Sequence, residues 1–265
     1  MISMLNKKVS IGSWMHTGSS DIAEMMGDAG FDWVAIDLEH SSTEHHQLPD
    51  MFRALQLGNT IPLVRIARPE ADDATKVLEA GAKGIIIPNV TSYYDYLHIK
   101  HKTTYPPTGL RGVGFNRSNM YGKYFLDYIK FKPMLIPMIE NVVAIEELDK
   151  ICKEEPDAVF IGPYDLSASL GKPGEFESEE YKNALSTIID ICNKNNIPAG
   201  IHQVNPDKEK LEEKINQGFK FIAYSSDVVM LQDQLQSIGD HLHNRGTSRP
   251  SNELDGYMNT YGGNS

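Results

Sequence analysis

The chain has 265 residues, 40% of them hydrophobic, and a formal net charge of −11. This length suits one α/β domain whose core is large enough to need neither disulfides nor structural metal ions. The acidic balance argues against nucleic acid or an anionic membrane as a partner, and the lack of a long apolar run or a secretory signal makes the cytoplasm the expected compartment.

Short apolar runs alternate with helical patterns along the whole chain. The runs are rich in Val and Ile and lack polar alternation, which is typical of parallel strands covered on both faces. The expected strands are Val9–Met15, Trp33–Leu38, Ile61–Ile66, Gly84–Val90, Leu135–Ile139, Ala158–Gly162, Pro198–Gln203 and Phe221–Tyr224. The expected helices are Ser20–Ala29, one after Thr43, Asp72–Ala80, one from Ser92, Val142–Cys152, Ser178–Asn195, Pro206–Gln217 and Val228–His241.

Glycine follows several of the expected helices, at Gly30, Gly81 and Gly218. A glycine in this place adopts the left-handed conformation that ends a helix before the next strand. Eight strand–helix units without a break in composition predict an α/β fold, a single-domain TIM (β/α)8 barrel, over residues 1–245. The polar tail, residues 246–265, is expected to be disordered or to contact another subunit.

Two further features lie outside this alternation. The segment Tyr105–Tyr124 is too long for a plain connection, and such loops are usually functional or contact another subunit. Cys152 and Cys192 both fall in expected helices and have no metal-ligand spacing, so we expect buried, reduced thiols.

Polar side chains follow the second and third strands, and in a TIM barrel the site forms at these carboxyl ends. His40 comes directly after the second strand and is a candidate general base, with a surface histidine as the alternative. Asp37 lies within that strand, and catalytic and structural readings are equally open. Arg65 ends the third strand, where a guanidinium suits a substrate carboxylate or a developing enolate; a structural salt bridge is the alternative.

Acidic side chains follow the fifth and sixth strands. Glu140 and Asp165 are expected to share one rim, and two oxygen ligands without cysteine or a histidine pair favour Mg²⁺ or Mn²⁺. Such a site leaves positions for water and a 2-keto acid, although a pair of acid–base carboxylates would look similar. Gly162 and Pro163, just before Asp165, let the backbone approach a ligand.

Other basic residues are less suited to chemistry. Lys83, Lys132 and Lys220 all precede their strands, so a Schiff-base lysine inside the barrel is not expected. His45-His46 fits an exposed helix start better than a metal cluster. His202 ends a strand and is expected to line the pocket.

The motifs at these strand ends resemble the HpcH/HpaI aldolase family, over roughly Val9 to His241. The resemblance rests on Gly30-Phe31-Asp32-Trp33, Ile36-Asp37, Glu39-His40, Val64-Arg65, Arg111-Gly112-Val113-Gly114, Ile139-Glu140 and Val159-Phe160-Ile161-Gly162-Pro163-Tyr164-Asp165-Leu166-Ser167. The Phe-Ile-Gly-Pro-x-Asp-Leu-Ser run is the most specific of them.

This resemblance implies a class II aldolase, a carbon–carbon lyase that depends on a divalent metal ion such as Mg²⁺, Mn²⁺ or Co²⁺. Glu140 and Asp165 would hold the ion, Arg65 would stabilise the pyruvate enolate, and His40 would move the proton. The family pairs that histidine with an acidic group on the third helix, and the matching position here is Glu79. It also implies a homohexamer whose last helix is exchanged between subunits.

Two positions depart from the family pattern. Met138 stands where a polar Gln is common, and Tyr164 replaces a small residue beside the metal ligand. Together with Gly162 and Pro163 they are expected to bind the substrate, and both changes would narrow or dry the pocket.

The expected reaction is therefore cleavage of a 4-hydroxy-2-keto acid to pyruvate and an aldehyde. The nearest alternative is another enolate-handling barrel lyase, of the citrate-lyase β-chain or phosphoenolpyruvate-mutase kind. A CoA ester would want a basic groove, which the acidic composition does not suggest. A non-catalytic binding or assembly barrel is the alternative of another class.

Overall fold

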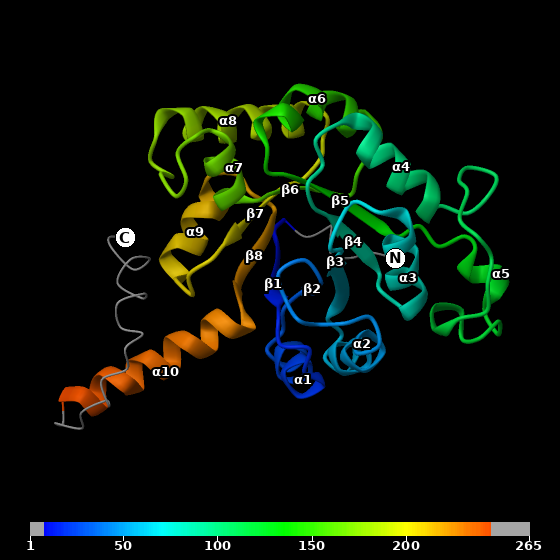
Figure 1. The fold of residues 1–265 in the computed structure, drawn as a ribbon, viewed down its shortest axis with the longest axis horizontal. Coiled ribbons are helices and arrows are strands. Elements are labelled where there is room, and N and C mark those ends of the chain that lie inside the picture. The colour runs from blue at the N-terminus through cyan, green and yellow to red at the C-terminus, as the bar shows by residue number, and fades with distance from the viewer. Residues whose placement is uncertain (1–7, 245–265) are drawn as a thin grey trace. The chain divides into compact units, whose positions relative to one another are not determined.

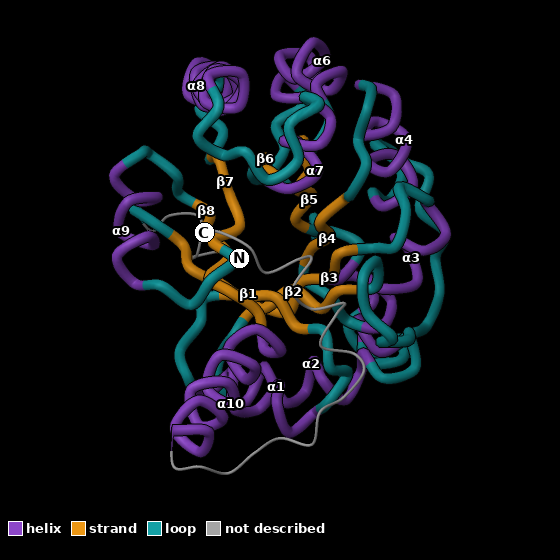
Figure 2. Tube along the Cα trace, turned by 60° about the vertical axis from the view of Figure 1, so that its left-hand side comes forward, coloured by secondary structure: helices purple, strands orange, loops and turns teal. Residues whose placement is uncertain are grey.

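The structure, a computed structural model, describes residues 8–244 and shows a closed barrel of eight parallel strands in sequence order. The expected (β/α)8 architecture is confirmed. The strands are β1 (Ser10–Met15), β2 (Trp33–Asp37), β3 (Ile61–Arg65), β4 (Gly84–Ile87), β5 (Met134–Ile139), β6 (Val159–Ile161), β7 (Ala199–Gln203) and β8 (Phe221–Ser226). Figure 2 shows these strands surrounded by helices.

The helices follow the strands in the order expected for a barrel, as Figure 1 shows by colour along the chain. They are α1 (Ser20–Asp28), α2 (Leu48–Leu57), α3 (Ala71–Ala80), α4 (Tyr93–Thr103), α5 (Phe125–Tyr128), α6 (Val142–Lys153), α7 (Pro163–Ser169), α8 (Glu179–Lys194), α9 (Lys208–Asn216) and α10 (Asp227–Asn244), with a 3-10 helix η1 (Arg117–Asn119). The long segment after α4 thus contains η1 and leads into α5. Within residues 8–244, no helix combines the length and apolar character needed to cross a membrane.

Local sequence signals set the ends of these helices. Ser19 accepts a hydrogen bond from the backbone of Ile22 at the start of α1, and Ser92 and Asp95 form a reciprocal capping box on α4. Gly81 ends α3 with φ +118°, the left-handed conformation that the sequence predicts there.

Large aromatic side chains fill the interior of the barrel. The ring of Trp33 stacks on Phe221 with 4.3 Å between centroids, and Phe160 meets both edge-on. Gly12 makes room for this packing, because a Cβ at position 12 would lie 2.0 Å from the Trp33 ring. The filled interior closes the barrel from below, so that a ligand site has to form at its rim.

The chain divides into two compact units, Met1–Val229, which contains the barrel, and Met230–Ser265. The second unit is described to Asn244 and contains most of α10. The tail expected over residues 246–265 lies outside the described residues. Cys152 and Cys192 are buried and free, as expected.

Candidate active site

A cavity of about 690 Å³ opens at the carboxyl ends of the strands. Its wall includes polar side chains that follow several different strands: His16, His40, Arg65, Asp165, His202 and Ser226. All six residues lie at or just after the carboxyl ends of their strands, which is where a barrel enzyme forms its site. We therefore take this cavity as the candidate active site.

Arg65 is fixed in this site by two carboxylates. Its Nε and Nη2 donate to the two oxygens of Asp37, at 2.8 and 2.6 Å, and its Nη1 lies 3.3 Å from Oε2 of Glu39. The guanidinium also lies over the ring of Trp14, 4.7 Å from its centroid. The structural salt bridge considered for Arg65 is present, and Arg65 also lines the cavity, so its role toward a substrate stays a prediction.

Asp37 itself is fully buried and strongly held in its ionised form. Burial alone would raise its pKa, but contacts with His16 and Arg65 outweigh burial and hold the pKa well below its usual range. The backbone N–H groups of Glu39 and His40 also donate to its carboxylate, at 3.0 and 3.3 Å. Asp37 is therefore the anchor of Arg65.

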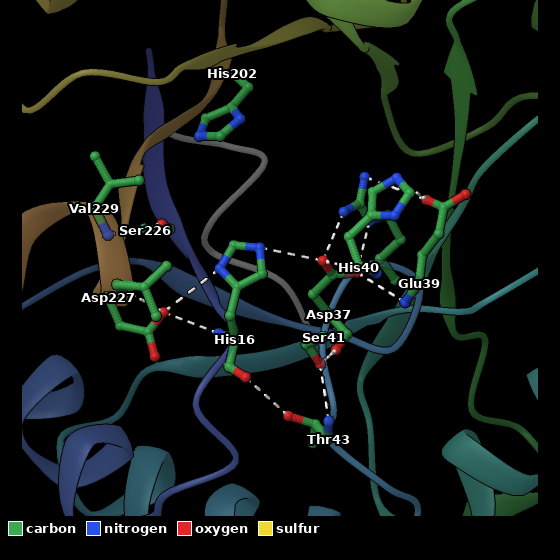
Figure 3. Close-up of polar contacts among 12 residues, drawn as sticks. His16, Asp37, Glu39, His40, Ser41, Thr43, His202, Ser226, Asp227 and Val229 are labelled. Carbon is green, nitrogen blue, oxygen red and sulfur yellow. Dashed lines mark hydrogen bonds and ion pairs between the residues drawn. The ribbon is translucent and has the colours of Figure 1, made fainter. Parts of the chain in front are cut away.

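His16 connects this anchor to the last strand of the barrel. Figure 3 shows its ring between two carboxylates, with Nε2 3.2 Å from Asp37 and Nδ1 3.5 Å from Asp227. The contacts with Asp227 and Asp37 raise the pKa of His16 from 6.5 to about 9, although burial works against them. At neutral pH His16 is thus a cation that ties the ends of β1, β2 and β8 together.

The stability of the protein should therefore depend on pH through His16. The folded chain keeps this proton up to about pH 9, whereas the unfolded chain releases it near pH 6.5, so the stabilisation is full below about pH 6.5 and is lost as pH rises through about 9. In urea titrations between these pH values, we expect wild type to lose more stability than His16→Asn. His46→Asn, at an exposed histidine, is the control. A stability difference between wild type and His16→Asn that is constant with pH would contradict this role.

Three carboxylates, those of Glu39, Glu140 and Asp165, interact electrostatically near Arg65. Glu140 is buried, and burial together with the charges of Asp165 and Glu39 raises its pKa to about 7, against the lowering effect of a backbone hydrogen bond from Asn89. The pKa of Glu39 is also raised, first by burial. The residues Glu140 and Asp165 are thus close enough to influence each other electrostatically, as the sequence predicts.

The carboxylate of Glu140 is held closely by its neighbours. Its Oε1 accepts the backbone N–H of Asn89 at 2.5 Å, and the amide of Asn89 donates to Glu39 at 2.9 Å. A Cβ on Gly162 would lie 2.6 Å from Oε2 of Glu140, so the carboxylate can take this position only because residue 162 is glycine.

The donor atoms that Glu140 and Asp165 offer to a metal ion are carboxylate oxygens. Across residues 8–244, no group of three or more His, Cys, Asp or Glu side chains is arranged to hold a metal ion. A site made by Glu140 and Asp165 would therefore have two protein ligands, which fits an oxygen-seeking divalent ion that keeps water and substrate in its other positions.

The structure does not bring His40 and Glu79 together within the chain. His40 lines the cavity with its side chain 66% exposed, and its Nε2 lies 3.9 Å from Glu39. Glu79 stands at the far end of α3, near Gly114. At the start of that helix, Asp73 contacts Nε2 of His45 at 3.0 Å. Helix α3 begins at the rim and ends at the opposite face of the barrel, which places Glu79 away from His40 of the same chain.

The four expected substrate-binding residues, Met138, Gly162, Pro163 and Tyr164, all line the cavity. Met138 is buried, whereas Tyr164 is half exposed and packs edge-on against Phe176, 5.1 Å between ring centroids. Their roles in binding stay predictions.

Sequence reasoning missed His16, Asn89 and Asp227. His16 and Asp227 come immediately after β1 and β8, and Asn89 comes two residues after β4. The rule that selects polar residues at strand ends would have found all three.

The HpcH/HpaI aldolase/citrate lyase family profile matches residues 10–233. The chain belongs to this family. A hydroxypyruvate/pyruvate aldolase of Roseobacter denitrificans is 31% identical over 86% of this chain and 90% of its own length. A 5-keto-4-deoxy-D-glucarate aldolase of Escherichia fergusonii is 30% identical over 88% and 92%. An HpcH/HpaI aldolase/citrate lyase family protein of Burkholderia cenocepacia has a TM-score of 0.85 at 25% identity, covering 92% of this chain and all of that one.

Membership of the HpcH/HpaI aldolase/citrate lyase family confirms the resemblance that the strand-end motifs indicate. The matched span contains every residue of the candidate site. It also reaches the first turns of α10, as far as residue 233. A member of this family is a carbon–carbon lyase, which agrees with a rim that combines a fixed guanidinium with clustered carboxylates.

Proposed function

We propose that the chain is a class II aldolase that cleaves a 4-hydroxy-2-keto acid to pyruvate and an aldehyde. The observation that carries this proposal is that Arg65, held by Asp37, and Asp165 line one cavity, with the buried carboxylate of Glu140 close enough to interact electrostatically with both. The aldolase names of the relatives described above support the same class of reaction.

Glu140 and Asp165 would hold a divalent metal ion, Mg²⁺ or Mn²⁺, with Co²⁺ as a further candidate. The raised pKa of Glu140 and the charge of Asp165 near it fit this assignment, because clustered carboxylates favour a cation between them. When bound, the ion would act as a Lewis acid toward the keto group of the substrate.

The remaining chemistry belongs to the side chains of the chain. Arg65 donates two of its five N–H groups to Asp37 and forms an ion pair with Glu39, and its remaining N–H groups would stabilise the developing enolate. His40 would take the proton of the 4-hydroxyl group as the carbon–carbon bond breaks. Met138, Pro163 and Tyr164 would exclude water from the enolate.

Pyruvate release from a 4-hydroxy-2-keto acid tests this proposal. The purified full-length chain should release pyruvate in the presence of Mg²⁺, Mn²⁺ or Co²⁺, stop on chelation and recover when the ion is restored. Release that survives chelation would contradict the metal assignment. If a panel of 4-hydroxy-2-keto acids gives no pyruvate and leaves the melting temperature unchanged, the result favours a non-catalytic binding or assembly role instead.

We also propose that the chain acts in the cytoplasm as a homo-oligomer, with a hexamer expected from its family. The free thiols Cys152 and Cys192 suit a reducing compartment. Helix α10 presents an exposed apolar row at helical spacing: Leu231, Leu235, Ile238 and Leu242. Such a row favours contact with another copy, in agreement with an exchanged last helix.

Replacing a residue of this row should therefore change the mass of the assembly. Light scattering should show an oligomer for wild type and smaller species for Ile238→Glu, because a buried glutamate would lack a partner. Gln236→Glu adds the same charge outside the row and should leave the oligomer intact. A wild-type chain that is monomeric at micromolar concentration would contradict the proposal.

A further inference from the structure

The cavity has a second region, at the ends of the last two strands of the barrel. Its wall comes from the ends of β7 and β8 and the first turn of α10: His202, Val204, Ser226, Val228 and Val229. Valine side chains dominate this wall. In the proposed reaction, pyruvate occupies the region of Arg65, so this second region faces the aldehyde part of the substrate.

The cationic side chains of the cavity already have anionic partners. No lysine lines the cavity within the described chain, and Arg65 is its one arginine. Arg65 is held by Asp37 and Glu39, and His16 lies between Asp37 and Asp227. These two cations thus face three carboxylates, which leaves no positive charge for an additional anion.

His202 does not supply a charge either. Its Nε2 lies 3.2 Å from the carbonyl oxygen of Ser225, and burial lowers the pKa of the ring to about 3. The neutral ring donates to that carbonyl through Nε2, so Nδ1 keeps a lone pair. Ser226 adds a hydroxyl group, whose oxygen accepts the backbone N–H of Val229 at 3.3 Å. This region therefore offers hydrogen bonds to a hydroxyl group but no ion pair.

A neighbouring cavity between α8 and α9 does contain lysines. Lys182, Lys210 and Lys214 line it, but Glu177 and Glu213 line it with them. Lys182 is paired with Glu177 at 2.7 Å. His202 and Val204 line both cavities, but the lysines belong to α8 and α9 and line only this one. The active-site cavity itself therefore presents valines and no lysine to a short aldehyde.

Resting on the proposed aldolase function, we infer that the aldehyde partner is short and uncharged, with an alkyl or hydroxyalkyl chain. Aldehydes that carry a carboxylate of their own are then poor substrates. The apolar wall disfavours an anionic aldehyde. The two cations of the cavity are already paired with carboxylates, and the neutral His202 adds no positive charge. The glucarate in the name of one relative carries a carboxylate at each end, so this chain would differ from that relative in its aldehyde.

The test is the condensation of pyruvate with aldehydes of matched length, using the full-length protein with Mn²⁺. Butanal is compared with succinic semialdehyde, and glycolaldehyde with glyoxylate. We expect kcat/KM to favour butanal over succinic semialdehyde by about tenfold or more, since an unpaired carboxylate would be desolvated against valines.

A charge-introducing variant separates the pocket's preference from the intrinsic reactivity of each aldehyde. Val204→Lys should shift the preference within both pairs toward the anionic aldehyde by about tenfold, through the new ion pair. Leu57→Lys adds the same charge on an exposed position of α2 and should leave the preference unchanged. If Val204→Lys does not fold, Val228→Lys, at a more exposed position of the same wall, takes its place.

The outcomes distinguish this inference from the function on which it rests. A preference of wild type for succinic semialdehyde, or a ratio that the lysine leaves unchanged, would overturn the inference and leave the aldolase proposal intact. If pyruvate condenses with neither member of either pair, the aldolase proposal fails and this inference with it.

Discussion

Asp165→Asn is expected to lower kcat/KM for pyruvate release by about 10³-fold or more, equivalent to roughly 4 kcal/mol of transition-state stabilisation. Asparagine keeps the shape of Asp165 in the first turn of α7. It removes the negative charge that would bind the metal ion. The loss should come from the ion and not from Glu140, since the charge of Asp165 contributes to raising the pKa of that residue. Without it, Glu140 is ionised more readily.

Two measurements make this prediction specific. Titration of Mn²⁺ into the protein should show weaker binding in Asp165→Asn, while the thermal unfolding of the metal-free variant stays close to wild type. Asp190→Asn removes the same charge from the exposed face of α8 and should retain activity and metal affinity. Full metal affinity in Asp165→Asn, together with full activity, would show that Asp165 is not a ligand.

The sequence is sufficient to predict the architecture, because each element is specified locally. Buried Val and Ile runs define the strands, and glycines such as Gly30 and Gly218, with φ +86° and +97°, end the helices where they are expected. The carboxyl ends of the strands then meet at one rim, which is why Arg65 and Asp165 line one cavity.

The partners of these residues are harder to predict, because they depend on distances across the barrel. The contact between His16 and Asp227 joins positions 211 residues apart in sequence, and only the closure of β8 on β1 brings them together. The link from Asn89 to Glu140 requires Asn89 to adopt a φ of +52°. Glu79 shows the same limit of sequence reasoning. Its helix, α3, lies where the sequence predicts it, but Glu79 is in the last turn, at the end away from the rim.

The second large effect is expected at Asp37, whose carboxylate holds two cations at once. Asp37→Asn should lower kcat/KM by about 10²-fold and destabilise the fold by about 3 kcal/mol, because a buried ion pair that loses one partner leaves the other charge uncompensated. Arg65 would lose the negative charge that its Nε and Nη2 contact. His16 would keep only one anionic partner, Asp227. The pKa of His16 should fall as a consequence, which an NMR titration of its ring can follow.

The functional part of this effect can be separated from the loss of stability. Activity measured well below the melting temperature of the variant should still be reduced, mainly in kcat, because a loosely held Arg65 stabilises the developing enolate less well. Asp73→Asn breaks the contact with His45 on the same rim, where both side chains are partly exposed, and should cost no more than about 1 kcal/mol and leave kcat unchanged. If Asp37→Asn were less stable but had a wild-type kcat, Asp37 would stabilise the fold without contributing to catalysis. Arg65 would then not depend on Asp37 for its position in the site.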